Sequence, residues 1–299
     1  MTIKYTEPTE DLATSTTLTD FTFAGLRGWT KPEGSPESIA AAEALSASSN
    51  RRVDAPIRKA FVRAAAEDAG VEGTPMSRIY AGGRSGVVAL KLYLALLLKC
   101  SSPPYSTEMT YPSLAILLDL DDPGKNGIRR IAHAVRTLQQ MNLLSVRRQP
   151  GKPNVLKLLD EHGDGTRYEL PSSAYSQAQH NKQPPAERDR HLYFKFPTRL
   201  WILGRVQHMS GAALVMLLIL LAEQAGDGKE IWFSTNNFPA RYAISHTTRA
   251  AGTRELISRG ILSVESRSLT AWVTKGAIFD PKRRRKVYSL TWQALTSAD

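Results

Sequence analysis

One stretch of the sequence places long hydrogen-bonding side chains at helical spacing. At 100° per residue and with Arg129 as zero, His133, Arg136 and Gln140 fall within about 40° of Arg129. The opposite side of the same helix is apolar, with Ile131, Ala134, Val135 and Leu138. Arginine can bind guanine through two hydrogen bonds, and glutamine can bind adenine in the same way. We therefore expect a helix buried on one face and able to read bases on the other, with Arg130 on the flank, where phosphate contact is favoured.

Basic loops follow at two places. After a predicted strand the chain carries Arg147, Arg148 and Lys152 around a Gln-Pro-Gly turn. A second cluster precedes the last predicted strand and consists of Lys275, Lys282, Arg283, Arg284, Arg285 and Lys286. Loops with such charge lie along a phosphate backbone or enter a minor groove, whose potential attracts arginine.

A second helix is expected from His246 to Arg259, closed by Gly260. Two rotations of this helix fit the sequence. If Leu256 is buried as Leu138 is, the outward residues are Thr247, Ala251, Arg254 and Ser258, and Arg249 points to the core. The other rotation buries Ala250, Thr253 and Ile257, and it exposes Thr248, Glu255 and Arg259. The sequence leaves both open, and its candidate contacts are Thr247, Thr248, Arg249 and Arg254.

The charge balance indicates a polyanionic partner. The 299 residues carry a net charge of +11, and the pI is about 9.8. Residues 1–50 hold three basic and seven acidic side chains, a balance of −4 that leaves +15 for the rest. A basic folded body attracts nucleic acid, the commonest polyanion of a cytoplasm.

Several other classes of protein are disfavoured. No apolar run reaches the roughly 18 residues of a membrane span, and no secretory signal begins the chain. Cys100 is the only cysteine, which fits a reducing cytoplasm and excludes a disulfide framework within one chain. There is no Walker-type phosphate loop, and the six histidines lack metal-ligand spacing. We expect no enzymatic activity, no cofactor and no metal. Four tryptophans are expected in the core: Trp201, Trp232, Trp272 and Trp292.

The body of the chain repeats itself. Ser85-Gly86 and Ser210-Gly211 each open a long apolar helix, and two further pairs of similar segments follow in the same order. The three pairs lie 125, 118 and 120 residues apart. The expected organisation is a disordered acidic tail (1–50), a basic helix with a linker (51–84, with the helix over 54–69), a first unit (85–170), a linker (171–191) and a second unit (192–299). The tail contains an apolar island, Phe21-Thr22-Phe23 with Leu26 and Trp29, which could bind a protein partner or the body itself.

Each unit reads helix, short helix, turn, helix, strand, basic loop, strand. This order resembles the winged-helix form of the helix-turn-helix family, and the two units together resemble double winged-helix plasmid replication initiators. The resemblance implies an α+β fold that is mainly helical, with two winged-helix domains in tandem. It also implies sequence-specific binding of double-stranded DNA, with a role at a plasmid or mobile-element origin. A transcriptional repressor, a partition protein and a winged-helix scaffold for proteins remain alternatives, and homodimerisation stays open.

Overall fold

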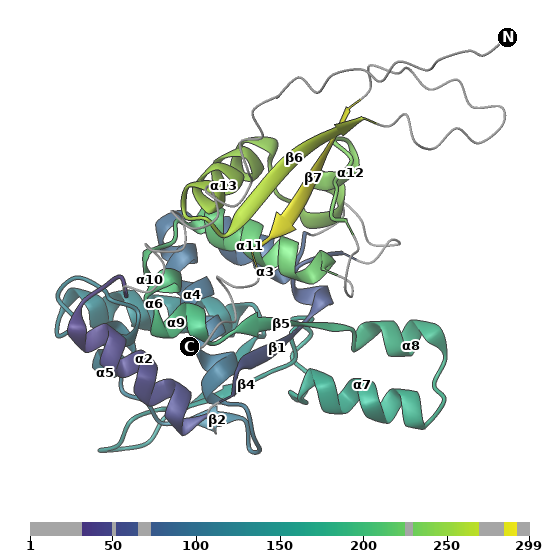
Figure 1. Cartoon of the computed structure of the whole chain (residues 1–299). Coiled ribbons are helices and arrows are strands. Elements are labelled where there is room, and N and C mark those ends of the chain that lie inside the picture. The colour runs from purple at the N-terminus through teal and green to yellow at the C-terminus, as the bar shows by residue number, and fades with distance from the viewer. Residues whose placement is uncertain (1–31, 50–51, 65–72, 225–229, 269–283, 292–299) are drawn as a thin grey trace, which may run out of the picture.

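The computed structural model describes residues 32–49, 52–64, 73–224, 230–268 and 284–291. About half of these residues are helical, and their strands form small antiparallel sheets. The α+β class expected from the sequence is therefore confirmed for this part of the chain. Figure 1 shows α13, β6 and β7 gathered at one end of the molecule and α2 and α5 at the other.

The first repeat forms seven elements in the order helix, helix, strand, helix, helix, strand, strand. They are α3 (Pro75–Tyr80), α4 (Gly83–Lys99), β2 (Ser106–Thr107), α5 (Tyr111–Leu117), α6 (Asn126–Gln140), β3 (Leu144–Arg147) and β4 (Val155–Leu158). The strands form one sheet in the order β2-β4-β3. Thr110 caps α5 by accepting a hydrogen bond from the Ser113 amide, so the helix begins where the sequence supplies a hydroxyl.

The second repeat follows the same plan. Its elements are α11 (Gly211–Glu223), α12 (Asn237–Tyr242), α13 (His246–Ser258), β6 (Leu262–Ser268) and β7 (Arg284–Leu290). An antiparallel bridge joins Ile231 to Tyr288 in β7, so the order across the sheet is Ile231, β7, β6. This order matches β2-β4-β3. Ser210 caps α11 and Ser245 caps α13, each by accepting from the backbone amide three residues on.

A strand precedes each repeat, and the two strands pair with each other. β1 (Asp54–Arg58) lies antiparallel to β5 (Tyr193–Pro197), with Asp54 opposite Pro197. β1 leads into a short 3-10 helix, η1 (Lys59–Phe61), whereas β5 leads into α9 (Arg199–Ile202) and α10 (Arg205–His208). Antiparallel pairing of equivalent strands is what a twofold axis produces. The pairing of β1 with β5 joins the two repeats directly, as such an axis between them would.

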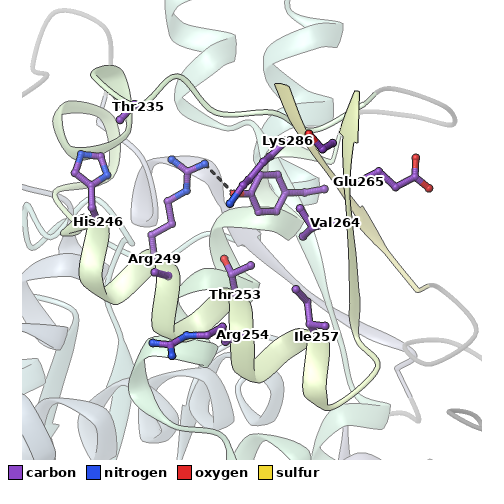
Figure 2. Close-up of a pocket in the computed structure, with 12 residues that line it drawn as sticks. Thr235, His246, Arg249, Thr253, Arg254, Ile257, Val264, Glu265 and Lys286 are labelled. Carbon is purple, nitrogen blue, oxygen red and sulfur yellow. Dashed lines mark hydrogen bonds between the residues drawn. The ribbon is translucent and has the colours of Figure 1, made fainter. Parts of the chain in front are cut away.

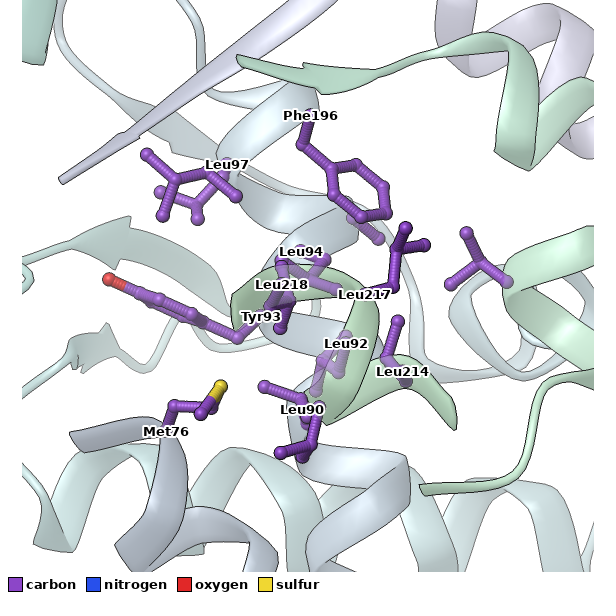
Figure 3. Packing of buried hydrophobic residues seen from close by; sticks show 14 of the residues in the cluster. Met76, Leu90, Leu92, Tyr93, Leu94, Leu97, Phe196, Leu214, Leu217 and Leu218 are labelled. Carbon is purple, nitrogen blue, oxygen red and sulfur yellow. The ribbon is translucent and has the colours of Figure 1, made fainter. Parts of the chain in front are cut away.

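One apolar core serves both repeats. α4 is buried along nearly all of its length after Gly86, and α11 is buried from Gly211 to Ala222 except at Ala212. Leu94 of α4, Leu218 of α11 and Phe196 of β5 belong to the same cluster (Figure 3). Burying a leucine stabilises a fold by about 2 kcal/mol, so the leucines of these two helices provide much of the stability of both repeats. Separate folding of residues 85–170 and 192–299 stays a prediction.

The helix expected over residues 54–69 is wrong in its described part. Residues 54–58 form β1, and the 3-10 helix η1 follows. Ala55 and Ile57 are buried, and the strand gains β5 as a partner from the second repeat. The alanines and Pro56 favoured a helix locally, but long-range pairing decided the conformation. Residues 65–69 lie outside the described residues.

The disorder expected up to residue 50 is also wrong for residues 32–49. They include α2 (Pro36–Ser48), which packs against α4, α5 and α9 through buried Ala42 and Leu45. Ser35 caps α2, and its hydroxyl also donates to Asp119 at 2.6 Å. The composition indicated disorder because it offers few apolar side chains, but these two suffice once a partner surface exists. The apolar island of the tail lies outside the described residues.

Both expected linkers contain helices. In the first, Thr74 and Ser77 form a reciprocal capping box that starts α3. In the second, α7 (Pro171–His180) and α8 (Pro185–Arg190) form a helical hairpin, and α7 contacts β1. Figure 1 shows this hairpin projecting from the body beside β1 and β5. Both helices have a proline at their first position. Proline favours the first turn of a helix but interrupts its interior, and composition alone does not distinguish the two positions.

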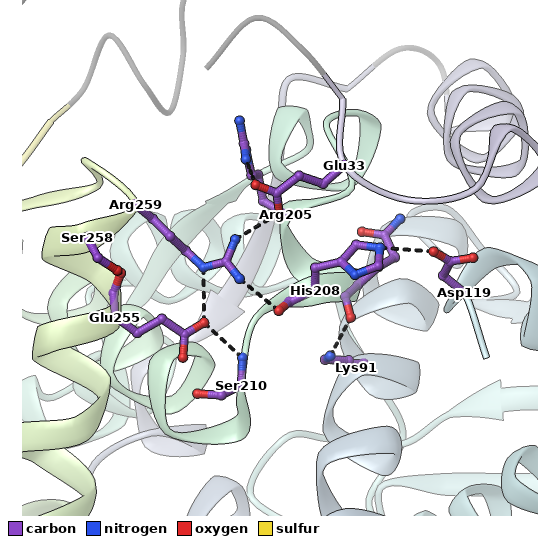
Figure 4. A network of polar contacts seen from close by, with 10 residues as sticks. Glu33, Lys91, Asp119, Arg205, His208, Ser210, Glu255, Ser258 and Arg259 are labelled. Atoms are coloured by element: carbon purple, nitrogen blue, oxygen red, sulfur yellow. Dashed lines mark hydrogen bonds and ion pairs between the residues drawn. The ribbon is translucent and has the colours of Figure 1, made fainter. Parts of the chain in front are cut away.

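A polar network joins the repeats beside the core (Figure 4). Arg259, next to the end of α13, donates to Glu33 at 2.8 Å, to the His208 carbonyl at 2.9 Å and to Glu255 at 3.0 Å. Nearby, Lys91 of α4 donates to the Gln207 carbonyl at 2.7 Å. Burial lowers the pKa of Lys91 to about 8. These bonds fix α13, α10 and the segment before α2 relative to one another.

Candidate nucleic-acid interface

The first candidate reading helix, α6, is held by its apolar face. Ile131, Ala134, Val135 and Leu138 are all buried, and α6 packs on α4 and α5. Gly127 lets the start of α6 approach α5, since an added Cβ would lie 2.9 Å from the Cβ of Ala115. The rotation expected from the sequence is confirmed for this helix.

The opposite face of α6 is open to solvent. Arg129, His133, Arg136 and Gln140 are all exposed, as is Arg130 on the flank. In the part of the chain that the structure describes, none of the three arginines has an ion-pair partner, in contrast to Arg58, Arg63 and Arg241 elsewhere in the chain. Their guanidinium groups are therefore available to an external anion.

The turn after β3 continues this basic region. Arg147, Arg148 and Lys152 are exposed, and Gly151 adopts a left-handed φ of 68° that closes the turn. Gln149 donates to Glu108 at 3.1 Å, which ties the turn to the segment after β2. From residue 125 to residue 154 the sequence has seven lysines and arginines and no aspartate or glutamate. No carboxylate of this stretch neutralises the reading helix or the turn.

In the second repeat the structure decides between the two rotations of α13. Leu256 is fully buried and Ile257 is 45% exposed, so the rotation that aligns Leu256 with Leu138 is confirmed. Thr247, Arg254 and Ser258 are exposed as this rotation predicts, whereas Ala251, also expected to point outward, is half-buried. Thr248 is half-buried beside the capping Ser245. Of the candidates on this helix, Thr247 and Arg254 therefore have the exposed position that contact with a ligand requires.

Arg249 does point inward, and aromatic rings accommodate it. Its guanidinium carbon lies 5.1, 4.7 and 5.5 Å from the ring centroids of Phe233, Phe238 and Tyr288. It also donates to the Tyr288 hydroxyl at 2.8 Å. A cation over aromatic faces is stabilised where plain burial would be costly. We therefore assign Arg249 to packing between α12, α13 and β7.

A groove of about 660 Å³ separates α13 from the β6–β7 hairpin (Figure 2). Its walls include Ile257, Val264, Arg254 and Lys286, and His246 lies at its end where α13 begins. The Oγ1 atom of Thr253 is buried in this wall with no hydrogen-bond partner within the described residues. The groove thus combines an apolar floor with Arg254 on one side and Lys286 and the carboxylate of Glu265 on the other.

An exposed aromatic residue lies beside the hairpin, next to the bridge that Ile231 forms with β7. Trp232 is 48% exposed, so its expected place in the core is wrong, whereas Trp201 is buried as expected. The guanidinium of Arg285 stacks over the Trp232 ring at 3.9 Å. Arg284 and Lys286 are exposed on the same strand, β7. Lys275, Lys282, Arg283, Trp272 and Trp292 lie outside the described residues.

Sequence reasoning missed the apolar exposure of this end of the molecule. Ile257 and Trp232 are two of the three large hydrophobic side chains found exposed among the described residues. The signal for Ile257 was present in the rotation of α13 that aligned Leu256 with Leu138. No sequence pattern indicated that Trp232 would be exposed, because its position depends on the single β-bridge between its neighbour Ile231 and Tyr288.

A second polar cluster lies inside the fold and does not form part of this surface. Arg58 is 1% exposed and forms ion pairs with Glu161 and, at 3.3 Å, with Asp160. Burial raises the pKa of Glu161 despite the guanidinium beside it. The cluster holds β1 to the loop after β4, and its burial closes it to a substrate.

Searches for other chemistry give little in the described part of the chain. No three His, Cys, Asp or Glu residues stand together there as a metal site would require. Among the described helices, none is long and apolar enough to cross a bilayer. The chain matches no family model, and neither a curated protein nor a solved structure shows significant similarity to it. Any function must therefore be argued from the surface itself.

Proposed function

We propose that this protein binds double-stranded DNA in a sequence-specific manner through two winged-helix units in tandem. In the first unit α6 is the recognition helix and the β3–β4 hairpin is the wing. In the second unit α13 and the β6–β7 hairpin take these places. The matching element order and the matching order across the two sheets support the assignment.

The observation that carries the proposal is the surface of the first unit. Four exposed side chains on one face of α6 belong to types that bind base edges, and an uncompensated basic turn follows them. A helix enters the major groove with such a face, while wing cations contact the phosphates and position the protein. Arg136 lies at the centre of this face, so we assign it to base contact and Arg147 and Arg148 to phosphates.

The second unit offers a weaker reading face. The exposed hydrogen-bonding side chains of α13 include one arginine, Arg254, together with His246, Thr247 and Ser258, and Ala250 and Ile257 are exposed on the same helix. Its hairpin supplies Arg284, Arg285 and Lys286. We therefore infer that the first unit contributes most of the sequence discrimination and that the second contributes affinity.

The salt dependence of binding tests this function. Binding sites are first selected from a random pool of duplexes. The affinity for the best site is then measured from about 50 to about 300 mM KCl, a range over which salt strongly screens charge interactions. Contact with about six phosphates gives a slope of log K against log salt of about −5. A slope near zero, or failure to select any site, would instead favour the scaffold that binds proteins.

As the biological role we propose initiation of replication at a plasmid or mobile-element origin. The tandem architecture is its support, and a repressor or a partition protein would share the same DNA-binding surface. Deleting the gene separates these roles. Loss of the replicon supports initiation, whereas changed transcript levels at normal copy number would contradict it.

A further inference from the structure

We propose that the N-terminal segment, residues 1–31, docks into the groove between α13 and the β6–β7 hairpin and competes there with DNA. The inference rests on the proposed function for the competition but not for the docking. The occupant of the groove is a segment of this same chain, and its docking reduces DNA binding by the second unit.

The chemistry of the groove fits an apolar segment flanked by carboxylates. Ile257 is 45% exposed and Val264 is half-buried, so part of the floor lacks a cover. Arg254 and Lys286 line its sides. When Leu256 is aligned with Leu138, the α6 residue equivalent to Ile257 is the exposed Gln139. DNA contact alone therefore does not account for an exposed isoleucine on α13. Glu265 lines the groove as well, beside these two cations. An apolar floor with Arg254 and Lys286 at its sides fits an apolar segment that has carboxylates next to it.

The tail has that character. Residues 5–20 contain four carboxylates, Glu7, Glu10, Asp11 and Asp20, and no lysine or arginine. The apolar island follows directly, with Phe21, Phe23, Leu26 and Trp29, and it contains one basic residue, Arg27. Aromatic side chains at this spacing can cover the exposed floor, while the carboxylates lie near the cations that would otherwise bind phosphate.

The described chain also starts beside the C-terminal end of α13, the helix that forms one wall of the groove. Glu33 pairs with Arg259, two residues beyond Ile257, and the Glu33 amide donates to the Leu203 carbonyl at 2.9 Å. Trp29 is four residues from this anchor and Phe21 is twelve, which gives an extended reach of about 14 and 40 Å. α13 is about 20 Å long, so the island can lie along it. Such tethering provides an effective concentration in the millimolar range, and weak contacts then suffice.

A spin label on the full chain tests docking without DNA. Cys100 is buried, and burial raises the pKa of its thiol to about 12, so an added cysteine at Ala24→Cys is labelled alone. We expect the label to broaden the amide signals of α13 and β6 and to leave those of α6 sharp. The substitutions Phe21→Ala, Phe23→Ala and Trp29→Ala together, or Ile257→Gln alone, should abolish the broadening. A control with Thr16→Ala, Thr17→Ala and Thr19→Ala should keep it.

A DNA titration of the same variants tests the competition. If the tail occupies the groove about nine-tenths of the time, the triple aromatic variant should bind DNA about tenfold more tightly, and the threonine control should be unchanged. If the label broadens the amide signals of all elements equally, or broadens none, docking is overturned whatever the DNA titration shows. If the label broadens only the signals of a second chain mixed with the labelled one, the groove binds the tail of another molecule. That result overturns the intramolecular proposal. Localised broadening with unchanged DNA affinity overturns the competition alone. If no variant binds DNA, the proposed function fails while the spin-label result still judges the docking.

Discussion

Two arginines on α13 illustrate how environment decides the role of a residue. Arg249 lies among Phe233, Phe238 and Tyr288, whereas Arg254, five residues later, is exposed. Arg249→Met keeps the apolar stem but removes the cation and the hydrogen bond to Tyr288. We expect a loss of about 1–2 kcal/mol of stability, measured by urea unfolding. DNA affinity of the folded variant should stay within about twofold, because in our assignment Arg249 contacts no DNA.

Arg254→Met provides the matched control on the same helix. Its stability should change by less than about 0.5 kcal/mol, because the side chain is exposed. Its DNA affinity should fall, because one cation of the proposed interface is lost. If the two variants exchanged these effects, the assignment of both arginines would be wrong.

Lys91 makes a prediction about pH. The pKa of its ammonium is lowered from 10.5 to about 8, chiefly by burial, so between these values the unfolded chain binds more protons than the folded one. Stability therefore rises with pH in this window, and from pH 8 to pH 10 Lys91 contributes about 2 kcal/mol of added stability. Lys91→Met should lack this rise. Chemical unfolding of both proteins at several pH values measures the difference, and parallel pH profiles would refute the assignment.

At the scale of elements, the sequence predicts those whose signals are local. The apolar residues of α6 recur at helical spacing within α6 itself, and Ser245 caps α13 from the position just before that helix. Both signals are therefore close in sequence to the helix that they specify. β1 and α2 depend on partners far away in the chain, β5 and α5. No pattern within residues 36–58 indicates which distant segments they pack against. For the same reason the candidate contacts on α6 keep their predicted exposure, whereas those on α13 required the structure.

Close packing of α11 on α13 depends on Gly252. A Cβ at this position would lie 2.2 Å from the Ala212 carbonyl oxygen and 2.9 Å from the Cβ of Met216. Gly252→Ala should therefore destabilise the protein by about 2 kcal/mol or more, although alanine favours a free helix by about 1 kcal/mol. Gly124→Ala is the control, since nothing lies within 4 Å of its added Cβ. Thermal or urea unfolding compares the two, and a stabilised Gly252→Ala protein would contradict the packing.

The recognition helix and the wing should affect binding differently. Arg136→Ala should reduce discrimination at one base pair by about 1–3 kcal/mol, because a bidentate contact is lost. Arg147→Ala with Arg148→Ala should weaken binding to all sequences and reduce the salt slope by about 2. Competition among mutated duplexes measures both effects.

The control for the wing removes the same charge elsewhere. Lys182→Ala with Arg190→Ala changes two exposed cations of the α7–α8 hairpin, outside the proposed interface. Its salt slope should remain close to that of the unaltered protein. Equal slopes in the two double variants would show that the wing makes no specific phosphate contact.

At the scale of the whole molecule, the shared core fixes the two units relative to each other. β1 pairs with β5, α11 contacts α3, and α4 and α11 enter the same cluster. If the two units read DNA as proposed, their rigid connection should require one spacing between the two half-sites. Units on a flexible linker, as expected for residues 171–191, would tolerate several spacings.

Half-site spacing therefore measures the rigidity of the molecule. Once a site has been selected, inserting about 5 base pairs at its centre turns one half-site to the opposite side of the duplex, and inserting about 10 returns it to the same side but one helical turn away. A rigid protein should bind neither insertion with both units, so both affinities should drop toward that of one half-site. Recovery with the longer insertion would mean that the units move apart on the DNA. Because the core of α4 and α11 would have to open for that movement, such recovery would contradict the arrangement described above.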